Sequence, residues 1–213
     1  MKLLKFPALI LAVSIIHAEP LFQSGQSGLL IATGGSYLTG ASPEFGASAG
    51  IQGTWGVDSL LALDLGASGS LFSARQASYG NANLISADID LKTPFMGLSV
   101  GSGYEFGVIY YDVGKGTLYS IPLTVSVYKY FEITENMSAI PVFSTGWDFG
   151  KQTVFDVYHN KHRVHVNSFN FAVSPEFLFG KFWMEPFYQY DKVKRLSPSN
   201  TIGLTLGLMY RLP

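Results

Sequence analysis

Apolar residues alternate with small or polar residues along most of the chain. In the segment 61–71 the odd-numbered residues are mostly apolar, beginning with Leu61 and Leu63, and the even-numbered residues are small or polar. The segment 202–212 repeats the pattern, with an apolar residue at every even position. Because successive side chains of a strand point to opposite faces, this period of two predicts β-strands with one apolar face.

Breaks rich in Gly, Pro, Asn and Ser divide this pattern into ten predicted strands. The predicted strands are 28–38, 43–55, 60–73, 84–92, 95–112, 118–131, 138–157, 164–179, 181–193 and 201–212. Each has at least the roughly 9–11 residues that a strand needs to cross a bilayer. Eight strands are the alternative, if 29–38 or part of 95–112 is not a separate strand. Polar connections at 75–83, 159–163 and 194–200 alternate with tight turns at 56–59, 93–94 and 180, as bacterial outer-membrane barrels require.

The composition decides between two all-β folds. Apolar residues make up 47% of the chain and charged residues only 14%, and Gly and Ser dominate the face opposite the apolar one. A water-soluble periplasmic sandwich or barrel, the alternative, would carry more charge on that face. Aromatic residues near predicted strand ends fit the girdles of a membrane barrel; they are Trp55, Tyr110, Tyr111, Tyr128, Tyr130, Phe131, Tyr188 and Tyr190. We therefore predict one transmembrane antiparallel β-barrel.

The first residues have the pattern of an export signal. Lys2 and Lys5 precede an apolar run over 6–16, and Ala18 is followed by the more polar Glu19. A positive start, a short apolar run and a small residue before the cut define a secretory signal peptide, and this run is shorter than the roughly 20 residues of a membrane helix. We predict a signal peptide at 1–18 and a barrel domain at 19–213.

Charge excludes some partners and indicates a polar interior. The chain has 14 basic and 15 acidic residues, so no basic excess exists to bind nucleic acid. Isolated charges on the small-residue face would lie in the lumen, where they are costly unless paired. We predict a lumen network, including Gln189, that either fills the barrel or lines a narrow path favouring cations. Its charged members are Asp64, Asp88, Asp90, Lys92, Glu105, Asp148, Glu176, Glu185 and Arg211.

Three segments carry a family resemblance. The segments 93–106 and 121–131, and the alternating end of the chain at 203–212, resemble small bacterial outer-membrane barrels related to OmpA, OmpX and OmpW. The resemblance implies an integral outer-membrane protein with a structural or narrow-pore role, in contact with lipids, lipopolysaccharide and small solutes. It also implies insertion by the barrel assembly machinery through a C-terminal signal, here Leu206, Leu208, Tyr210 and Leu212. The usual terminal Phe is replaced by Leu212-Pro213.

One segment concentrates basic residues in a predicted outer loop: His159, Lys161, His162, Arg163 and His165. Its histidines could serve as metal ligands, but their spacing defines no closed site, and we predict no metal and no cofactor. A solvated loop is the simplest interpretation. Arg and Lys also suit phosphate, so a surface module binding lipopolysaccharide, a host surface or a phage is the alternative function.

Enzymes on small barrels need particular side-chain pairs. Outer-membrane lipid A deacylases carry a His-x-Ser pair on one strand, whereas His165 and Ser168 are spaced by three and would face opposite sides. Omptin-type proteases need paired acids and an Asp-His pair at the rim, and Asp148, Asp156 and His159 do not reproduce that pairing. We expect no enzymatic activity, and a lipid A-modifying enzyme is the weaker alternative.

Overall fold

The computed structural model describes residues 25–39, 44–74, 79–93, 96–111, 114–155, 160–193 and 198–212. The predicted signal peptide at 1–18 lies outside these residues. No helix in the described ranges is long and apolar enough to cross a membrane. The strands are β1 (Ser27–Thr39), β2 (Glu44–Gly56), β3 (Leu61–Ala74), β4 (Tyr79–Lys92), β5 (Gly97–Tyr111), β6 (Gly114–Tyr128), β7 (Phe131–Thr134), β8 (Met137–Phe155), β9 (Lys161–Phe179), β10 (Phe182–Val193) and β11 (Ser199–Leu212).

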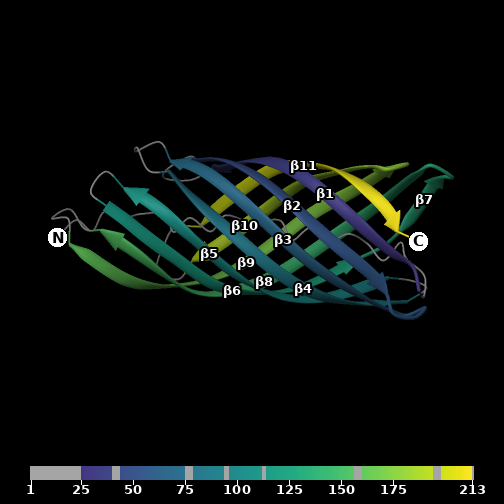
Figure 1. Ribbon diagram of the computed structural model, residues 1–213, viewed down its shortest axis with the longest axis horizontal. Coiled ribbons are helices and arrows are strands. Elements are labelled where there is room, and N and C mark those ends of the chain that lie inside the picture. Colours follow the sequence, from purple (N-terminus) through teal and green to yellow (C-terminus); the bar gives the residue numbers. More distant parts are fainter. Residues whose placement is uncertain are drawn as a thin grey trace.

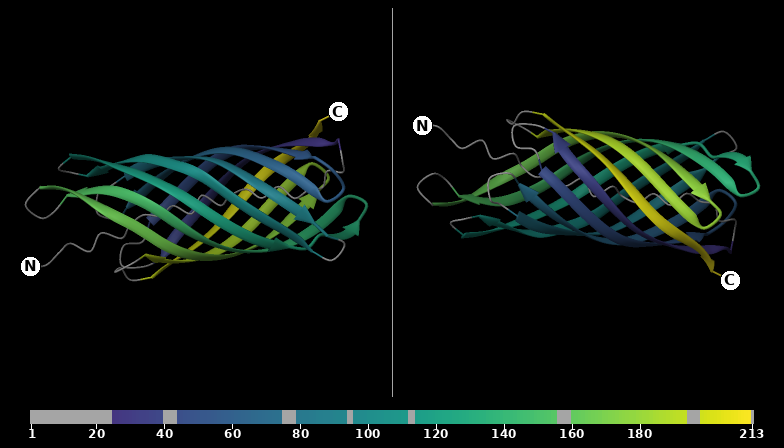
Figure 2. Two further views of the ribbon diagram at one scale, coloured as in Figure 1. Left: turned by 90° about the horizontal axis from the view of Figure 1, so that it is seen from below. Right: turned by 90° about the horizontal axis from the view of Figure 1, so that it is seen from above.

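Ten of these strands form a closed antiparallel barrel (Figures 1 and 2). Consecutive strands pair with each other, β6 pairs directly with β8, and β1 pairs with β11 along its whole length. This closure satisfies the backbone hydrogen bonds of both edges, which a strand in lipid requires. The predicted all-β barrel and its ten strands are confirmed, and the eight-stranded alternative is wrong.

The additional strand β7 was not predicted. Its four residues are Phe131–Thr134. The sequence predicts Phe131 as the end of the strand 118–131 and residues 132–137 as a connection. In the structure this short strand pairs with the first residues of β8. All four are exposed. This small hairpin lies at one end of the barrel and does not contribute to the closed wall (Figure 1).

Several strands begin earlier than predicted. β4 begins at Tyr79 instead of residue 84, and β6 at Gly114 instead of residue 118. The Gly and Asn residues at the start of β4 and β6 are typical of turns. In both strands, however, these first residues pair with residues of β5. The Asn81 side chain even joins the ladder, because its Oδ1 accepts a hydrogen bond of 3.1 Å from the backbone N–H of Val108.

The two ends of the barrel differ. The end that we call the turn end holds the connections at 57–60, 93–96 and 180–181 and the segment 129–136, which contains β7. The start of β1 and the end of β11 lie there too. At the opposite end, the loop end, lie the connections β1–β2, β3–β4, β5–β6, β8–β9 and β10–β11. With 19 residues each, β8 and β9 are the longest strands, and their hairpin reaches beyond its neighbours at the loop end (Figure 2).

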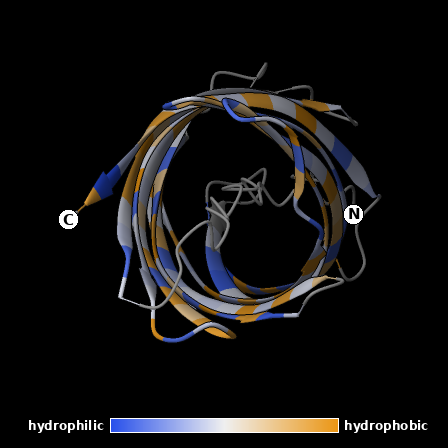
Figure 3. Ribbon diagram, turned by 90° about the vertical axis from the view of Figure 1, so that its right-hand side faces the viewer, coloured by the Kyte–Doolittle hydropathy of each residue, from blue (hydrophilic) through white to orange (hydrophobic). Residues whose placement is uncertain are grey.

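The two faces of the wall have the predicted character. Leu65 on the outward face is 46% exposed, whereas Asp64 on the lumen face is 2% exposed. The same alternation of exposed and buried residues runs through β6, β9 and β11. The end-on view in Figure 3 shows the closed ring of strands that separates the two faces. An outward face of this kind matches the apolar band of a transmembrane barrel.

The prediction that Tyr128 belongs to an aromatic girdle is wrong. Tyr128 is 7% exposed and lies on the lumen face, in phase with Ser120, Thr124 and Ser126. Its ring covers the paired Gly97, where a Cβ atom would overlap it. Trp55, Tyr130, Phe131 and Tyr188 are exposed, as girdle residues should be; their exposed fractions lie between 40% and 46%.

The lumen also holds apolar clusters that the sequence analysis did not predict. Leu30, Ala32, Leu178, Trp183 and Met209 pack together across four strands, with Trp183 fully buried. Two smaller clusters are formed by Leu38, Phe72 and Ile109, and by Tyr128, Ile140 and Val142. The interior is therefore a polar surface interrupted by apolar contacts, which narrows any path through it.

Candidate functional site

Carboxyl groups are the most prominent chemical feature of the lumen. Eight acidic side chains are buried, each between 1% and 7% exposed: Asp64, Asp88, Asp90, Glu105, Asp148, Glu176, Glu185 and Asp191. No Lys or Arg is buried among the side chains that the structure describes. Seven of the eight were predicted. Asp191 was missed, although it follows Gln189 by two residues in one strand and therefore shares its face.

Three of these groups, Glu105, Asp148 and Asp191, form what we call the loop-end carboxyls. They come from β5, β8 and β10, and Asp148 lies close enough to the other two for direct electrostatic interaction. The register explains their proximity, because Asp148 pairs with Ser168 and Asp191 pairs with Asn170, two residues further along β9. The fold thus gathers three acids that are far apart in sequence.

Neutral donors hold the loop-end carboxyls in place. Ser120 donates a hydrogen bond of 2.6 Å to Glu105 Oε2, Ser168 donates one of 2.7 Å to Asp148 Oδ2, and Gln189 Nε2 donates one of 2.7 Å to Asp191 Oδ1. The second oxygens of Glu105 and Asp191 accept no hydrogen bond from the described residues. These neutral donors fix the orientation of the carboxyl groups and leave the second oxygens of Glu105 and Asp191 open to a ligand.

The other five acids, the turn-end carboxyls, lie on opposite walls of the barrel. Asp64, Asp88 and Asp90 come from β3 and β4, where Asp64 pairs directly with Asp88 and interacts with both other acids. Glu176 and Glu185 come from β9 and β10, on either side of the turn at 180. Three strands separate the two groups in each direction around the barrel. Glu176 Oε2 accepts a hydrogen bond of 3.1 Å from Trp183 Nε1.

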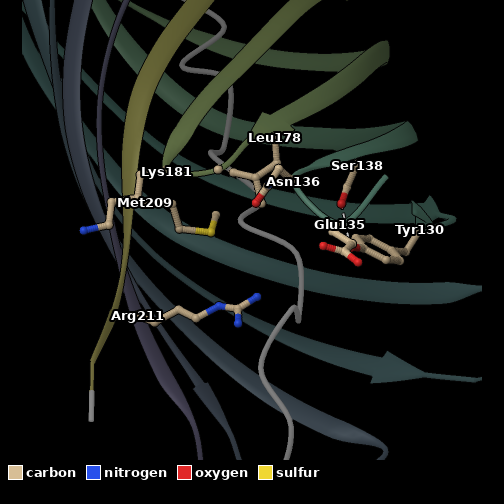
Figure 4. A pocket seen from close by; sticks show the side chains of 9 residues that line it. Tyr130, Glu135, Asn136, Ser138, Leu178, Lys181, Met209 and Arg211 are labelled. Atoms are coloured by element: carbon tan, nitrogen blue, oxygen red, sulfur yellow. Dashed lines mark hydrogen bonds between the residues drawn. The ribbon is translucent and has the colours of Figure 1, made fainter. Parts of the chain in front are cut away.

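The two predicted lumen cations, Lys92 and Arg211, lie at the turn end, where β4 and β11 end. Arg211 is exposed, because it lies beyond Met209, the last buried residue of β11, where its side chain reaches water. It lines a pocket with Lys181 and Glu135 (Figure 4). Lys92, the last residue of β4, is half-buried. The charged partners available in this pocket are of both signs, so it favours no single class of ligand.

The predicted outer loop is in large part a strand. Lys161, His162, Arg163 and His165 form the exposed beginning of β9, paired with the last residues of β8. The loop assignment is wrong for Lys161, His162 and Arg163, because the β8–β9 hairpin continues its pairing beyond the end of the apolar band, whereas His165 lies within the predicted strand 164–179. His159 lies outside the described residues. Within those residues, no three His, Asp or Glu side chains are grouped as metal ligands.

The structure places His165 and Ser168, the candidate acyl-transfer pair, on opposite faces of β9. His165 is exposed, whereas Ser168 is 6% exposed on the lumen face and donates its hydrogen bond to Asp148. A nucleophile and its base must lie within hydrogen-bond reach, which this arrangement prevents.

The residues of the predicted C-terminal assembly signal share the outward face of β11. Leu206, Leu208, Tyr210 and Leu212 are between 37% and 45% exposed. Lys181 Nζ lies 5.6 Å from the centre of the Tyr210 ring, a cation–π contact at the turn end. This arrangement presents a continuous apolar ridge beside the closing seam, and recognition of the ridge by the assembly machinery stays a prediction.

No protein-family model and no curated protein matches the chain. Similar solved structures include the β domain of the Bordetella autotransporter BrkA, with a TM-score of 0.48, 9% identity and coverage of 86% of this chain and 99% of that chain. The N-terminal barrel of Pseudomonas aeruginosa OprF has a TM-score of 0.41 and 15% identity, with coverage of 86% of this chain and 97% of that chain. Ail of Yersinia pestis has a TM-score of 0.39 and 12% identity, with coverage of 88% of this chain and 100% of that chain. These likenesses concern barrel architecture alone.

Proposed function

We propose that the protein is an integral outer-membrane barrel of a Gram-negative bacterium, related to the OmpA, OmpX and OmpW type, and that its lumen passes small cations. The outward face supports a membrane setting, since large apolar side chains such as Ile31, Ile85 and Phe149 are 49–59% exposed. Such a surface would be unstable in water, and a closed strand barrel is one of the two structures that can span a bilayer.

The tight turns indicate the orientation. Outer-membrane barrels place short turns in the periplasm and put both chain ends there when the strand number is even. The turn end would therefore face the periplasm, and the loop end the outside. Ten strands enclose a lumen far narrower than that of the general porins, which use about 16 strands.

The buried carboxyls are the observation that carries the proposal. Among the described side chains, eight acids are buried and no Lys or Arg is, so ionisation of these acids makes the potential inside the barrel negative. A lumen lined by charge of one sign concentrates ions of the opposite sign, and rings of acidic side chains select cations in channels. The second oxygens of Glu105 and Asp191 accept no hydrogen bond from the described residues, which leaves them open to a passing cation.

The proposal is tested by ion selectivity in a planar bilayer. We expect protein refolded in detergent to give small, discrete conductance steps, with a reversal potential in a KCl gradient that shows preference for K⁺ over Cl⁻. The double variant Glu105→Gln, Asp148→Asn keeps the side-chain shapes while removing two loop-end charges, so we expect the K⁺/Cl⁻ permeability ratio to fall severalfold. Glu132→Gln is the matched control, because Glu132 is exposed on β7, and it should leave the ratio unchanged.

Two results would contradict this function. A folded barrel, identified by its heat-dependent gel shift, that never conducts would make the lumen a structural filling and move the function to the outer surface. A conducting barrel whose selectivity is the same in the double variant and in the control would show that the loop-end carboxyls do not contact the permeating ion. We propose no catalytic activity, in line with the separation of His165 from Ser168.

A further inference from the structure

Basic side chains gather on one part of the outward face at the loop end. We call this set the basic patch: Lys115 of β6, Lys151 of β8, and Lys161, Arg163 and His165 of β9. All five are exposed. The register makes them neighbours, because Lys151 pairs with His165, and Arg163 pairs with Thr153, two residues further along β8. Tyr119 of β6 pairs with Lys151, which brings Lys115 to the same side.

The basic patch lies directly beside the apolar band. Phe149 and Trp147 precede Lys151 by two and four residues on the same face of β8, and Phe149 is 50% exposed. The ring centroids of Trp147 and Phe169 lie 5.6 Å apart. On β6, the Lys115 ammonium lies 5.9 Å from the centre of the Tyr110 ring, which stacks on Tyr79 at 4.8 Å. Aromatic pairs of this kind mark the level of the lipid headgroups in membrane barrels.

The side chains of the basic patch are available to a ligand. The side chains of Lys151, Arg163 and His165 form no hydrogen bond or ion pair with a described residue. No acid with a described side chain is exposed on the outward face at the loop end, whereas the turn end exposes Asp58, Glu132 and Glu135 among its bases. Three Lys residues and Arg163 thus place four positive charges on the outward side of the barrel.

We propose that the basic patch binds the phosphate groups of lipopolysaccharide in the outer leaflet. Charge complementarity supports this partner, since Arg and Lys form charge-assisted hydrogen bonds with phosphate. The position supports it too, because a lipid with its phosphates at Lys151 and Arg163 would lay its acyl chains against Phe149, Trp147 and Phe169. A soluble anion would gain nothing from these apolar side chains. The inference rests on the membrane setting and orientation proposed above, but not on ion passage.

The test measures lipid binding in detergent by native mass spectrometry, with a chelator present to remove bridging divalent cations. The probes are lipopolysaccharide with both lipid A phosphates and the same lipid after enzymatic removal of its phosphates. The double variant Lys151→Gln, Arg163→Gln should bind the phosphorylated lipid about tenfold more weakly or worse, since each cation near a charged lipid contributes on the order of 1 kcal/mol. Dephosphorylated lipid should bind weakly to both proteins.

The matched control is Lys129→Gln, Lys181→Gln, which removes two turn-end cations that also lie over aromatic rings. It should bind the phosphorylated lipid like the original protein. Equal losses in the two double variants, or no loss in the patch variant, would overturn the proposal. Displacement of the lipid by equimolar inorganic phosphate would also overturn it, in favour of a free-anion site. Because conductance is not measured, this result is independent of the selectivity test.

Discussion

Leu206→Arg is expected to lower the free energy of unfolding by about 2–4 kcal/mol, the cost of an Arg side chain at the middle of the lipid face of a barrel. Leu206 lies near the centre of β11, is 37% exposed, and faces outward between Thr33 and Met184 of the neighbouring strands. Denaturant unfolding of protein refolded into lipid vesicles, followed by the heat-dependent gel shift, measures the loss. Refolding without cellular machinery separates this cost from any effect on the assembly signal.

The adjacent residue provides the control. Thr205 is 5% exposed on the lumen face and pairs directly with Glu185, so the guanidinium of Thr205→Arg would lie beside a carboxyl group. We expect Thr205→Arg to cost clearly less than Leu206→Arg. Similar losses, or the reverse order, would mean that the outward and lumen faces of β11 are assigned the wrong way round.

Gly107→Ala is expected to destabilise the barrel by about 1–3 kcal/mol, the usual cost of forcing extra volume into a packed site. Gly107 is buried on the lumen face of β5, where a Cβ atom would overlap the backbone carbonyl oxygen of Asn81 and lie 3.0 Å from Ala82 Cα. Both contacts are with the β4 backbone, which cannot rotate away as a side chain can. The same vesicle unfolding assay measures the change.

Gly35→Ala is the matched control for this substitution. Gly35 is exposed on the outward face of β1, and the nearest atom to a Cβ there is the Gly46 carbonyl oxygen at 3.9 Å. The added methyl group makes only an ordinary van der Waals contact, and the loss of backbone freedom in the unfolded chain favours folding by up to about 1 kcal/mol. If Gly107→Ala proves as stable as Gly35→Ala, the close approach of β4 and β5 is not as described.

The strands and most of the lumen acids could be predicted because both follow from one local rule. A period of two assigns Asp64 and Asp88 to the same face as their small neighbours without knowledge of any partner strand. The same rule, applied consistently, would have found Asp191 and placed Tyr128 inside. Tyr128 was assigned to a girdle because it lies near a strand end, and there the local phase was the better guide.

Other features depend on information that a local pattern does not contain. The four residues of β7 are too few to show a period, and the Gly and Asn residues at the start of β4 resemble a turn until β5 supplies a partner. The meeting of Glu105, Asp148 and Asp191 follows from the stagger of three separate strands. The solvent exposure of the Arg211 side chain depends on where the lumen ends, and only the closed barrel defines that point.

The seam between β1 and β11 has a consequence for the order of events during folding. It joins Ser27 to Leu212, nearly the full span of the described chain, so the earliest strand waits for the last one before its edge is satisfied. Until then the sheet has two unpaired edge strands, and each can pair with a strand of another copy. Contacts so distant in sequence form slowly. The 14 residues of β11 therefore determine whether a nascent chain becomes a sealed monomer or the nucleus of an aggregate.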